Sequence, residues 1–125
     1  MKKDYRIKRS QEIEMVMKKG KSKANPYFIV YKHANPGTDH FRLALSVGKK
    51  IGNAPERNKI KRRIRAITSE YKDQLDPKFD YFIIARKGAA ELDFPMFKKN
   101  LEQIYQRMHM IPKPKPQALP AKGQS

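Results

Sequence analysis

The chain has 125 residues, enough for one domain with a modest core. Its 29 Lys and Arg residues outnumber 12 Asp and Glu, and the formal charge of +17 favours a polyanionic partner, nucleic acid ahead of an anionic membrane. The sequence has no long apolar run and no cysteine, so we expect no transmembrane helix, secretory signal, disulfide or thiolate zinc site. The three histidines are scattered, so we expect no metal site, and a reduced cytoplasm fits this composition.

The first half of the chain predicts one helix and two strands. The helix covers residues 10–19, with Ser10 as a plausible N-cap and Gly20 as the stop. Residues 25–33, NPYFIVYKH, are rich in aromatic and β-branched side chains and predict a strand. An Asn-Pro-Gly turn follows. In residues 41–47, FRLALSV, large apolar side chains alternate with small or polar ones, as is typical of a half-buried strand. We expect these two strands to form an antiparallel hairpin.

The second half predicts two helices around one strand. A Gly- and Pro-bearing loop leads into a basic helix over residues 55–75, and the hydrophobic residues 80–86 predict a central strand. A last helix covers residues 94–110. The order α-β-β-α-β-α predicts an α+β fold. We expect one domain over residues 1–110, followed by a disordered tail rich in Pro and Lys over residues 111–125.

Helical periodicity divides the basic helix into distinct faces. At about 100° per residue, an apolar stripe faces the core and consists of Ile60, Ile64, Ile67 and Tyr71. The adjoining cationic arc consists of Arg57, Asn58, Lys61, Arg62 and Arg65. Lys59 and Arg63 flank the stripe on its other side, and we expect them to be merely solvated charges.

A charge run is often only a solvated helix face. Here arginine is used beyond what solubility needs, and its planar fork suits bidentate contact with phosphate. Lys49, Lys50 and a Gly-bearing loop lie at the predicted N-terminus of this helix, where free N–H groups and the helix dipole favour anions. Together with the net charge, these features favour binding of a polyanion.

The first predicted strand offers a second candidate surface. One of its faces carries Tyr27, Ile29, Tyr31 and His33. An aromatic strand beside small residues and cations is a surface on which unpaired bases stack. The alternative is that Tyr27 and Tyr31 pack under the N-terminal helix.

The sequence SVGKKIGNAPERNKIKRRIR, residues 46–65, resembles the signature of the protein component of bacterial ribonuclease P. The matching residues are Lys49, Lys50, Gly52, Asn53, Ala54, Arg57, Asn58, Lys61, Arg62 and Arg65. The resemblance extends from about Tyr5 to Met108 and includes the order of elements. It implies a ribosomal-protein-type α/β sandwich with a left-handed crossover around the basic helix, although right-handed connections are the rule.

The resemblance also implies a function. The protein would be a subunit that assists a catalytic RNA in removing the 5′ leader from precursor tRNA, and it would have no catalytic residues of its own. The catalytic RNA would be contacted by Lys49, Lys50, Asn53, Arg57, Asn58, Lys61, Arg62 and Arg65. The single-stranded leader would lie in a cleft formed by Ile13, Met17, Ile29, Tyr31 and Ser46. Mg²⁺ would be held mainly by RNA and substrate oxygens, with no organic cofactor and no membrane partner.

Ile13 and Met17 depart from the family pattern, which commonly has two Phe residues there. Apolar contact with a base survives this change, whereas aromatic stacking from this helix does not. The carboxylates are scattered, with no cluster suited to acid–base or two-metal chemistry, which fits chemistry performed by an RNA.

Two other functions remain as alternatives. Composition alone does not exclude a ribosomal or other structural RNA-binding protein. A DNA binder that places the basic helix in the major groove is disfavoured, because a strand and a Gly-rich loop precede that helix instead of a supporting helix.

Overall fold

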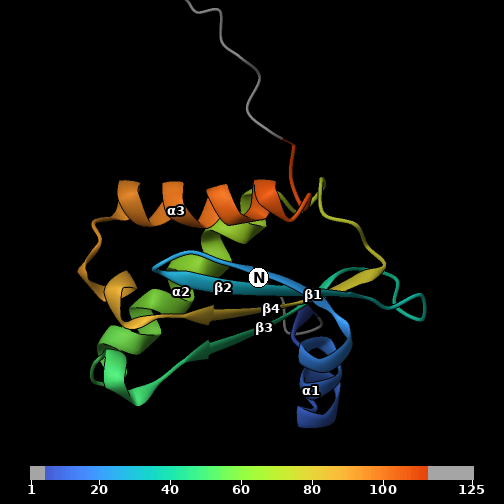
Figure 1. Ribbon diagram of the computed structural model, residues 1–125, viewed down its shortest axis with the longest axis horizontal. Helices are drawn as coiled ribbons and strands as arrows, with labels where there is room; N and C mark the ends of the chain where they lie inside the picture. The colour runs from blue at the N-terminus through green and yellow to red at the C-terminus, as the bar shows by residue number, and fades with distance from the viewer. Residues whose placement is uncertain (1–4, 113–125) are drawn as a thin grey trace, which may run out of the picture.

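The computed structural model describes residues 5–112, in which four strands form one sheet with helices on both faces (Figure 1). The strands are β1 (Lys21–Ala24), β2 (Phe28–Ala34), β3 (Arg42–Val47) and β4 (Phe79–Ala85). The α-helices are α1 (Ser10–Lys19), α2 (Ala54–Glu70) and α3 (Phe94–Arg107), and the 3₁₀ helices are η2 (Lys49–Ile51) and η3 (Lys87–Glu91). This arrangement confirms the predicted α+β class.

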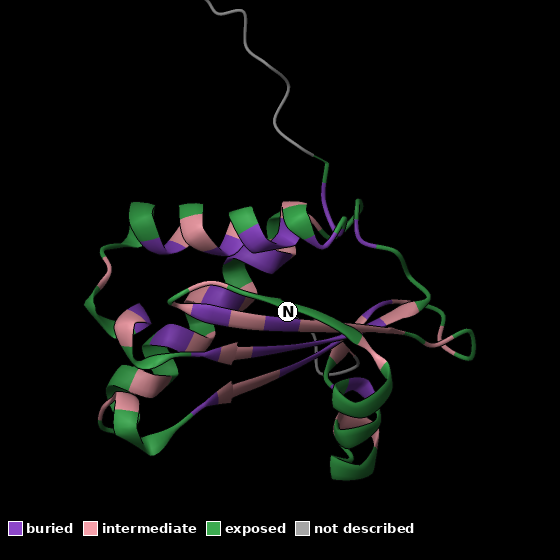
Figure 2. Cartoon of the chain, in the orientation of Figure 1, coloured by how far each residue is buried: buried purple, intermediate pink, exposed green. Residues whose placement is uncertain are grey.

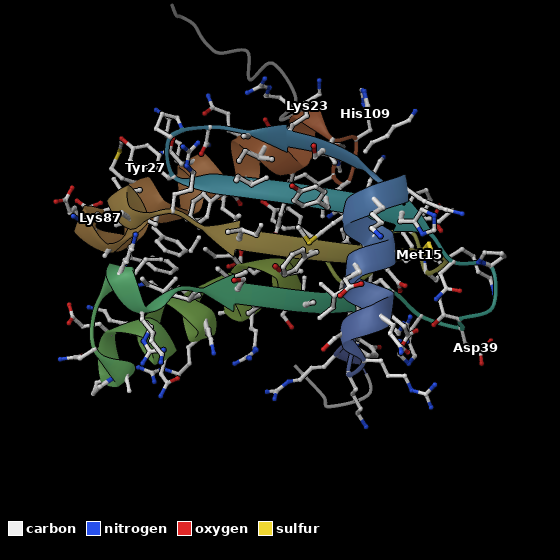
Figure 3. The ribbon with its side chains drawn as sticks, turned by 60° about the horizontal axis from the view of Figure 1, so that its bottom comes forward. Met15, Lys23, Tyr27, Asp39, Lys87 and His109 are labelled. Carbon is white, nitrogen blue, oxygen red and sulfur yellow. The ribbon has the colours of Figure 1, made fainter. Side chains whose placement is uncertain are left out.

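The strands lie in the order β1-β2-β4-β3, and β3 runs parallel to β4 while the other neighbours are antiparallel. Figure 3 views the sheet from the side of α1, with β3 and β4 both pointing left, β4 above β3, and α2 behind the sheet. The chain leaves β3, passes through α2 behind the sheet and returns as β4 above β3, so this crossover connection is left-handed. It therefore departs from the right-handed rule, as the sequence resemblance implies.

The main core lies between the sheet and the helices α2 and α3. The predicted apolar stripe of α2 is confirmed, because its three isoleucines are buried and Tyr71 packs at the margin. Met110 and Ile111 are also buried in this core, so the packed domain extends to Ile111. Residues 113–125 of the predicted tail lie outside the described residues.

Among the helices within residues 5–112, only α1 lies on the other face of the sheet, where it covers one end and is largely exposed (Figure 2). The bounds of α1 are as predicted, but Arg9 occupies the N-cap position and no side chain caps the helix. A Cβ atom at Gly20 would lie 2.4 Å from the carbonyl oxygens of Val16 and Lys32, so only glycine fits where α1 turns into β1. Within residues 5–112, no helix is both long and apolar enough to cross a bilayer.

The strands differ from the prediction in two ways. The short strand β1 was not predicted, because its sequence KSKA is polar and exposed throughout. The expected hairpin between residues 25–33 and 41–47 does not form, because β4 inserts between β2 and β3 and pairs with both. The strand β4 is the most buried of the four, and a central position gives its apolar side chains partners on both faces.

The ends of the two later helices also differ from the prediction. The basic helix ends at Glu70, and the turns that follow still bury Leu75 in the main core. The last helix ends at Arg107, and Met108 follows as its C-cap residue.

Candidate nucleic-acid interface

A capping box fixes the N-terminus of α2, where several predicted RNA contacts lie. The side-chain oxygen of Asn53 accepts a hydrogen bond from the backbone N–H of Glu56 at 3.0 Å, and the Glu56 carboxylate accepts one from the backbone N–H of Asn53 at 3.2 Å. Such a cap stabilises a helix by about 1 kcal/mol. Asn53 therefore has a structural role at this helix end, while Lys49 and Lys50 on η2 are exposed.

The cationic arc of α2 includes three half-buried side chains, Arg57, Lys61 and Arg65, at one-turn spacing. The Nε atom of Arg57 is buried and makes no hydrogen bond with any described residue. Burial, and then repulsion from Arg6, lowers the pKa of Arg65. Burial of the unpaired Nε of Arg57 and of the charged guanidinium of Arg65 both cost free energy. Hydrogen bonds to an anion would offset this cost.

Arg63 is not the solvated charge expected from the sequence. Its Nη1 donates to the carbonyl oxygen of Leu92 at 3.2 Å, and its guanidinium carbon lies 5.6 Å from the ring centroid of Phe94 and 5.4 Å from that of Phe97. These contacts join α2 to the start of α3, because a cation is attracted to the face of an aromatic ring. Lys59, in contrast, is exposed.

The α1 side of the sheet carries most of the predicted leader residues. Ile29 on β2, Ile84 on β4 and Ser46 on β3 lie in one row across three strands, and all three are half-buried. The next row contains Tyr31, Phe82 and Ala44, which pack against α1. In Figure 3, α1 crosses the end of the sheet nearer Asp39, and it is the one described helix on this face. Ile84 also packs against the cluster that contains Val16 of α1. We call the row of Ile29, Ile84 and Ser46 the open row.

Tyr27 and Tyr31, which were expected to share one face of the first predicted strand, have different positions. Tyr31 is half-buried and belongs to the cluster beneath α1, so the alternative that it packs there is partly correct. Tyr27 instead packs against the main core, next to Gly88 of η3, because it precedes β2 rather than lying within it. Tyr27 is therefore not part of the surface that surrounds the open row.

The cationic arc and the sheet face meet at a hollow of about 170 Å³. Ile13 of α1 and Ala44 of β3 line one side of it, and Lys61 and Arg65 of α2 line the other. The side chain of Met17, farther along α1, is 43% exposed. One predicted leader contact, Ile13, thus shares a hollow with two predicted contacts for the catalytic RNA, Lys61 and Arg65.

Sequence reasoning missed the cations of the N-terminal segment. Arg6, Lys8 and Arg9 line a second hollow of about 550 Å³ beside the first turn of α1. A bridge between Arg6 and Leu43 places this segment along the edge of β3. The basic sequence YRIKRS carried the signal, but only the fold brings it next to the arc of α2.

A family model described as Ribonuclease P matches residues 1–109 of this chain. The chain belongs to the ribonuclease P protein family. The ribonuclease P protein component of Listeria welshimeri is 51% identical over 104 residues, covering 83% of this chain and 87% of that protein. The corresponding protein of Bacillus mycoides is 48% identical over 110 residues, covering 88% and 96% of the two chains.

Solved structures of ribonuclease P proteins share the fold. The RNase P protein of Staphylococcus aureus superposes with a TM-score of 0.82 at 39% identity, covering 86% of this chain and 97% of that chain. The RNase P protein of Thermotoga maritima gives a TM-score of 0.72 at 34% identity, covering 82% and 96%. The sheet and the helices described above are therefore those of the ribonuclease P protein fold.

Proposed function

We propose that this chain is the protein subunit of ribonuclease P, and that it assists endonucleolytic removal of the 5′ leader from precursor tRNA. It would bind the catalytic RNA and the leader, while the RNA performs the chemistry. The observation that carries this proposal is the hollow in which Ile13, at the border of α1 with the sheet, meets Lys61 and Arg65 of the cationic arc. One protein surface can therefore contact both RNAs at once.

We assign the catalytic RNA to the N-terminal half of α2 and to η2. The residues proposed for this contact are Lys49, Lys50, Asn53, Arg57, Asn58, Lys61, Arg62 and Arg65. The unpaired Nε of Arg57 and the half-buried guanidinium of Arg65, which lines the hollow beside Ile13, support the assignment, because phosphate oxygens accept hydrogen bonds from both groups.

We assign the leader to the open row and its border with α1. The residues proposed for this contact are Ile13, Met17, Ile29, Tyr31 and Ser46. Half-buried aliphatic side chains beside one aromatic ring suit unpaired bases, which have apolar faces, and base–aromatic stacking contributes about 1–3 kcal/mol per base. Only Tyr31 in this set has a ring, so we expect the aliphatic residues to contribute apolar contact alone.

We propose that the Mg²⁺ required by the reaction is held mainly by RNA and substrate oxygens. Among residues 5–112, no three His, Asp or Glu side chains gather in a way that would hold a metal ion. We therefore assign no step to a metal bound by the described side chains. We also propose a cytoplasmic location, where precursor tRNA would be the substrate.

Reconstitution tests the proposal. The chain is added to a bacterial ribonuclease P RNA at low Mg²⁺, and cleavage of a precursor tRNA is followed. We expect the protein to restore cleavage at the mature 5′ end. Absence of any effect, together with co-sedimentation with ribosomes, would instead favour a ribosomal or other structural RNA-binding protein.

A further inference from the structure

Few apolar contacts hold α1 against the sheet. Val16 is the only buried residue of this helix, and Ile13 beside it is half-buried. Met15 and Met17 are 44% and 43% exposed. Burial of one or two aliphatic side chains attaches the helix but does not fix its direction, because apolar contact is non-directional. The tight junction with β1 at Gly20 holds the C-terminal end of α1, and a directional contact near its N-terminal end would fix the angle at which the helix crosses the strands.

An ion-pair network supplies this contact. Arg42 on β3 donates from Nη2 to Glu12 at 2.6 Å and to Asp80 at 2.8 Å, and from Nε to Asp80 at 2.9 Å. Asp80 on β4 is 4% exposed and also accepts from the side-chain amide of Asn35 at 3.1 Å. Two hydrogen bonds to Asp80 therefore fix the guanidinium group of Arg42 within the sheet, and Glu12 is its partner on α1. Hydrogen bonding to Asp80 raises the pKa of Arg42, so its guanidinium keeps its charge.

The network lies on the side of α1 away from the open row. Glu12 and Met15 line a hollow of about 320 Å³ next to Asp80, and Figure 3 shows Met15 on the side of α1 that faces the turn of Asp39. Ile13, on the opposite side of the helix, lines the hollow shared with α2. The ion pair of Glu12 and the row that contains Ile29 therefore lie on opposite sides of α1.

We propose that Glu12 is a positioning residue for leader binding: through Arg42 it holds α1 at the end of the sheet and keeps the open row accessible. This inference rests on the proposed function, in which the leader contacts that row. Without the ion pair, α1 can tilt about Val16 toward Ile29, whose half-buried side chain offers it further apolar contact. A leader would then have to displace the helix before binding.

Glu12 can be replaced without leaving a buried charge unpaired. After Glu12→Ala, Arg42 keeps its hydrogen bonds to Asp80, whereas an Arg42 variant would leave the buried Asp80 without its cation. Glu12→Gln keeps an oxygen that can accept from Arg42, so it should have an intermediate effect. The matched control is Glu14→Gln, which removes the same charge from an exposed residue of α1 that makes no ion pair with any described residue.

The position of α1 can be measured directly, because the chain has no cysteine and accepts spin labels at chosen sites. Labels are placed at Lys18→Cys on α1 and Lys99→Cys on α3, which are exposed and lie on helices that cover opposite faces of the sheet. We expect a narrow distance distribution in the parent and in Glu14→Gln, and a broader or shifted one in Glu12→Ala. An unchanged distribution in Glu12→Ala would overturn the inference.

Binding by the reconstituted holoenzyme separates positioning from a general structural effect. Glu12→Ala should weaken binding of a precursor tRNA with a leader by about tenfold, as expected if about a tenth of the molecules keep the competent arrangement. Binding of mature tRNA and kcat should stay within about twofold of the parent, and Glu14→Gln should match the parent for both RNAs. Equal losses for both RNAs, or none, would overturn the inference. If the unmodified holoenzyme shows no preference for the leader, the proposed leader function itself fails and this role falls with it.

Discussion

Tyr31 on β2 and Phe82 on β4 lie directly opposite each other, with ring centroids 6.0 Å apart and ring planes inclined by 26°. Phe82 is buried in the cluster beneath α1, whereas Tyr31 is half-buried at the border of the open row. Tyr31 is therefore both a packing partner and a candidate base-stacking surface, and its replacement can affect stability as well as binding.

Tyr31→Ala should weaken binding of a precursor tRNA with a 5′ leader by about 1–3 kcal/mol, because a stacking surface is lost. Binding of mature tRNA should be nearly unchanged. The control Tyr31→Phe keeps the ring and should bind the precursor like the parent. Equilibrium binding of both RNAs checks this, at a temperature where all variants are folded. A similar loss for both RNAs would mark Tyr31 as a residue of the fold only.

The half-buried arginines of α2 should contribute to assembly with the catalytic RNA. Arg57→Ala and Arg65→Ala should each weaken it by about 1–3 kcal/mol, because charge-assisted contacts with phosphate are lost. Lys59→Ala is the matched control, since Lys59 is an exposed cation of the same helix outside the arc. Filter binding at constant salt gives the comparison. Parental affinity in both arginine variants would remove this helix from the interface.

Arg63→Ala should reduce stability rather than RNA affinity. The variant loses the hydrogen bond to Leu92 and the contacts with Phe94 and Phe97, which join α2 to α3. We expect a loss of about 1–2 kcal/mol in the free energy of unfolding, measured by urea denaturation. Weakened RNA binding with unchanged stability would show that Arg63 belongs to the interface instead.

Affinity for the catalytic RNA should fall steeply with salt. Each phosphate contact releases counterions, and the logarithm of the binding constant decreases by about 0.7–0.9 per contact for each tenfold rise in salt. Titrations at several salt concentrations would give the slope. A nearly flat response would contradict an interface dominated by phosphate contacts.

Stability should depend on Tyr71 at alkaline pH. Burial, followed by the hydrogen bond to Glu102 and its charge, raises the pKa of Tyr71 from 10.0 to about 12. The unfolded chain therefore loses this proton first, so the contribution to stability is present below about pH 10 and lost as the pH rises to about 12. Urea unfolding of the parent and of Tyr71→Phe tests this. Over that interval the parent should lose more stability than the variant, and equal losses would contradict the assignment.

Local periodicity predicted the parts of the fold that depend on nearby residues. The bounds of α1 and the buried stripe of α2 follow from apolar spacing within a single helix, and both are confirmed. Strand pairing depends on contacts distant in sequence. The hairpin was therefore expected between neighbours along the chain, whereas β4 takes the place between β2 and β3.

The candidate site, too, could be predicted only where it depends on residues close together in the sequence. The helical wheel identified the arc of α2 because its cations follow the apolar stripe, and the resemblance named the same residues. The wheel could not show that Arg63 contacts α3, or that Arg6 comes close to Arg65, because both relationships depend on how separate segments pack. The assignment of particular residues to the leader stays a prediction.

Site-specific cross-linking within the reconstituted holoenzyme tests the central claim most directly. A photo-cross-linker is attached to a single cysteine at Ser46→Cys on the open row, at Arg62→Cys on the arc of α2, or at Gln103→Cys on the exposed side of α3 as a control. With a labelled precursor tRNA, we predict that the site at Ser46 reacts with the leader and the site at Arg62 with the catalytic RNA, while the control reacts with neither. Leader cross-links from α3 but none from Ser46 would contradict the account.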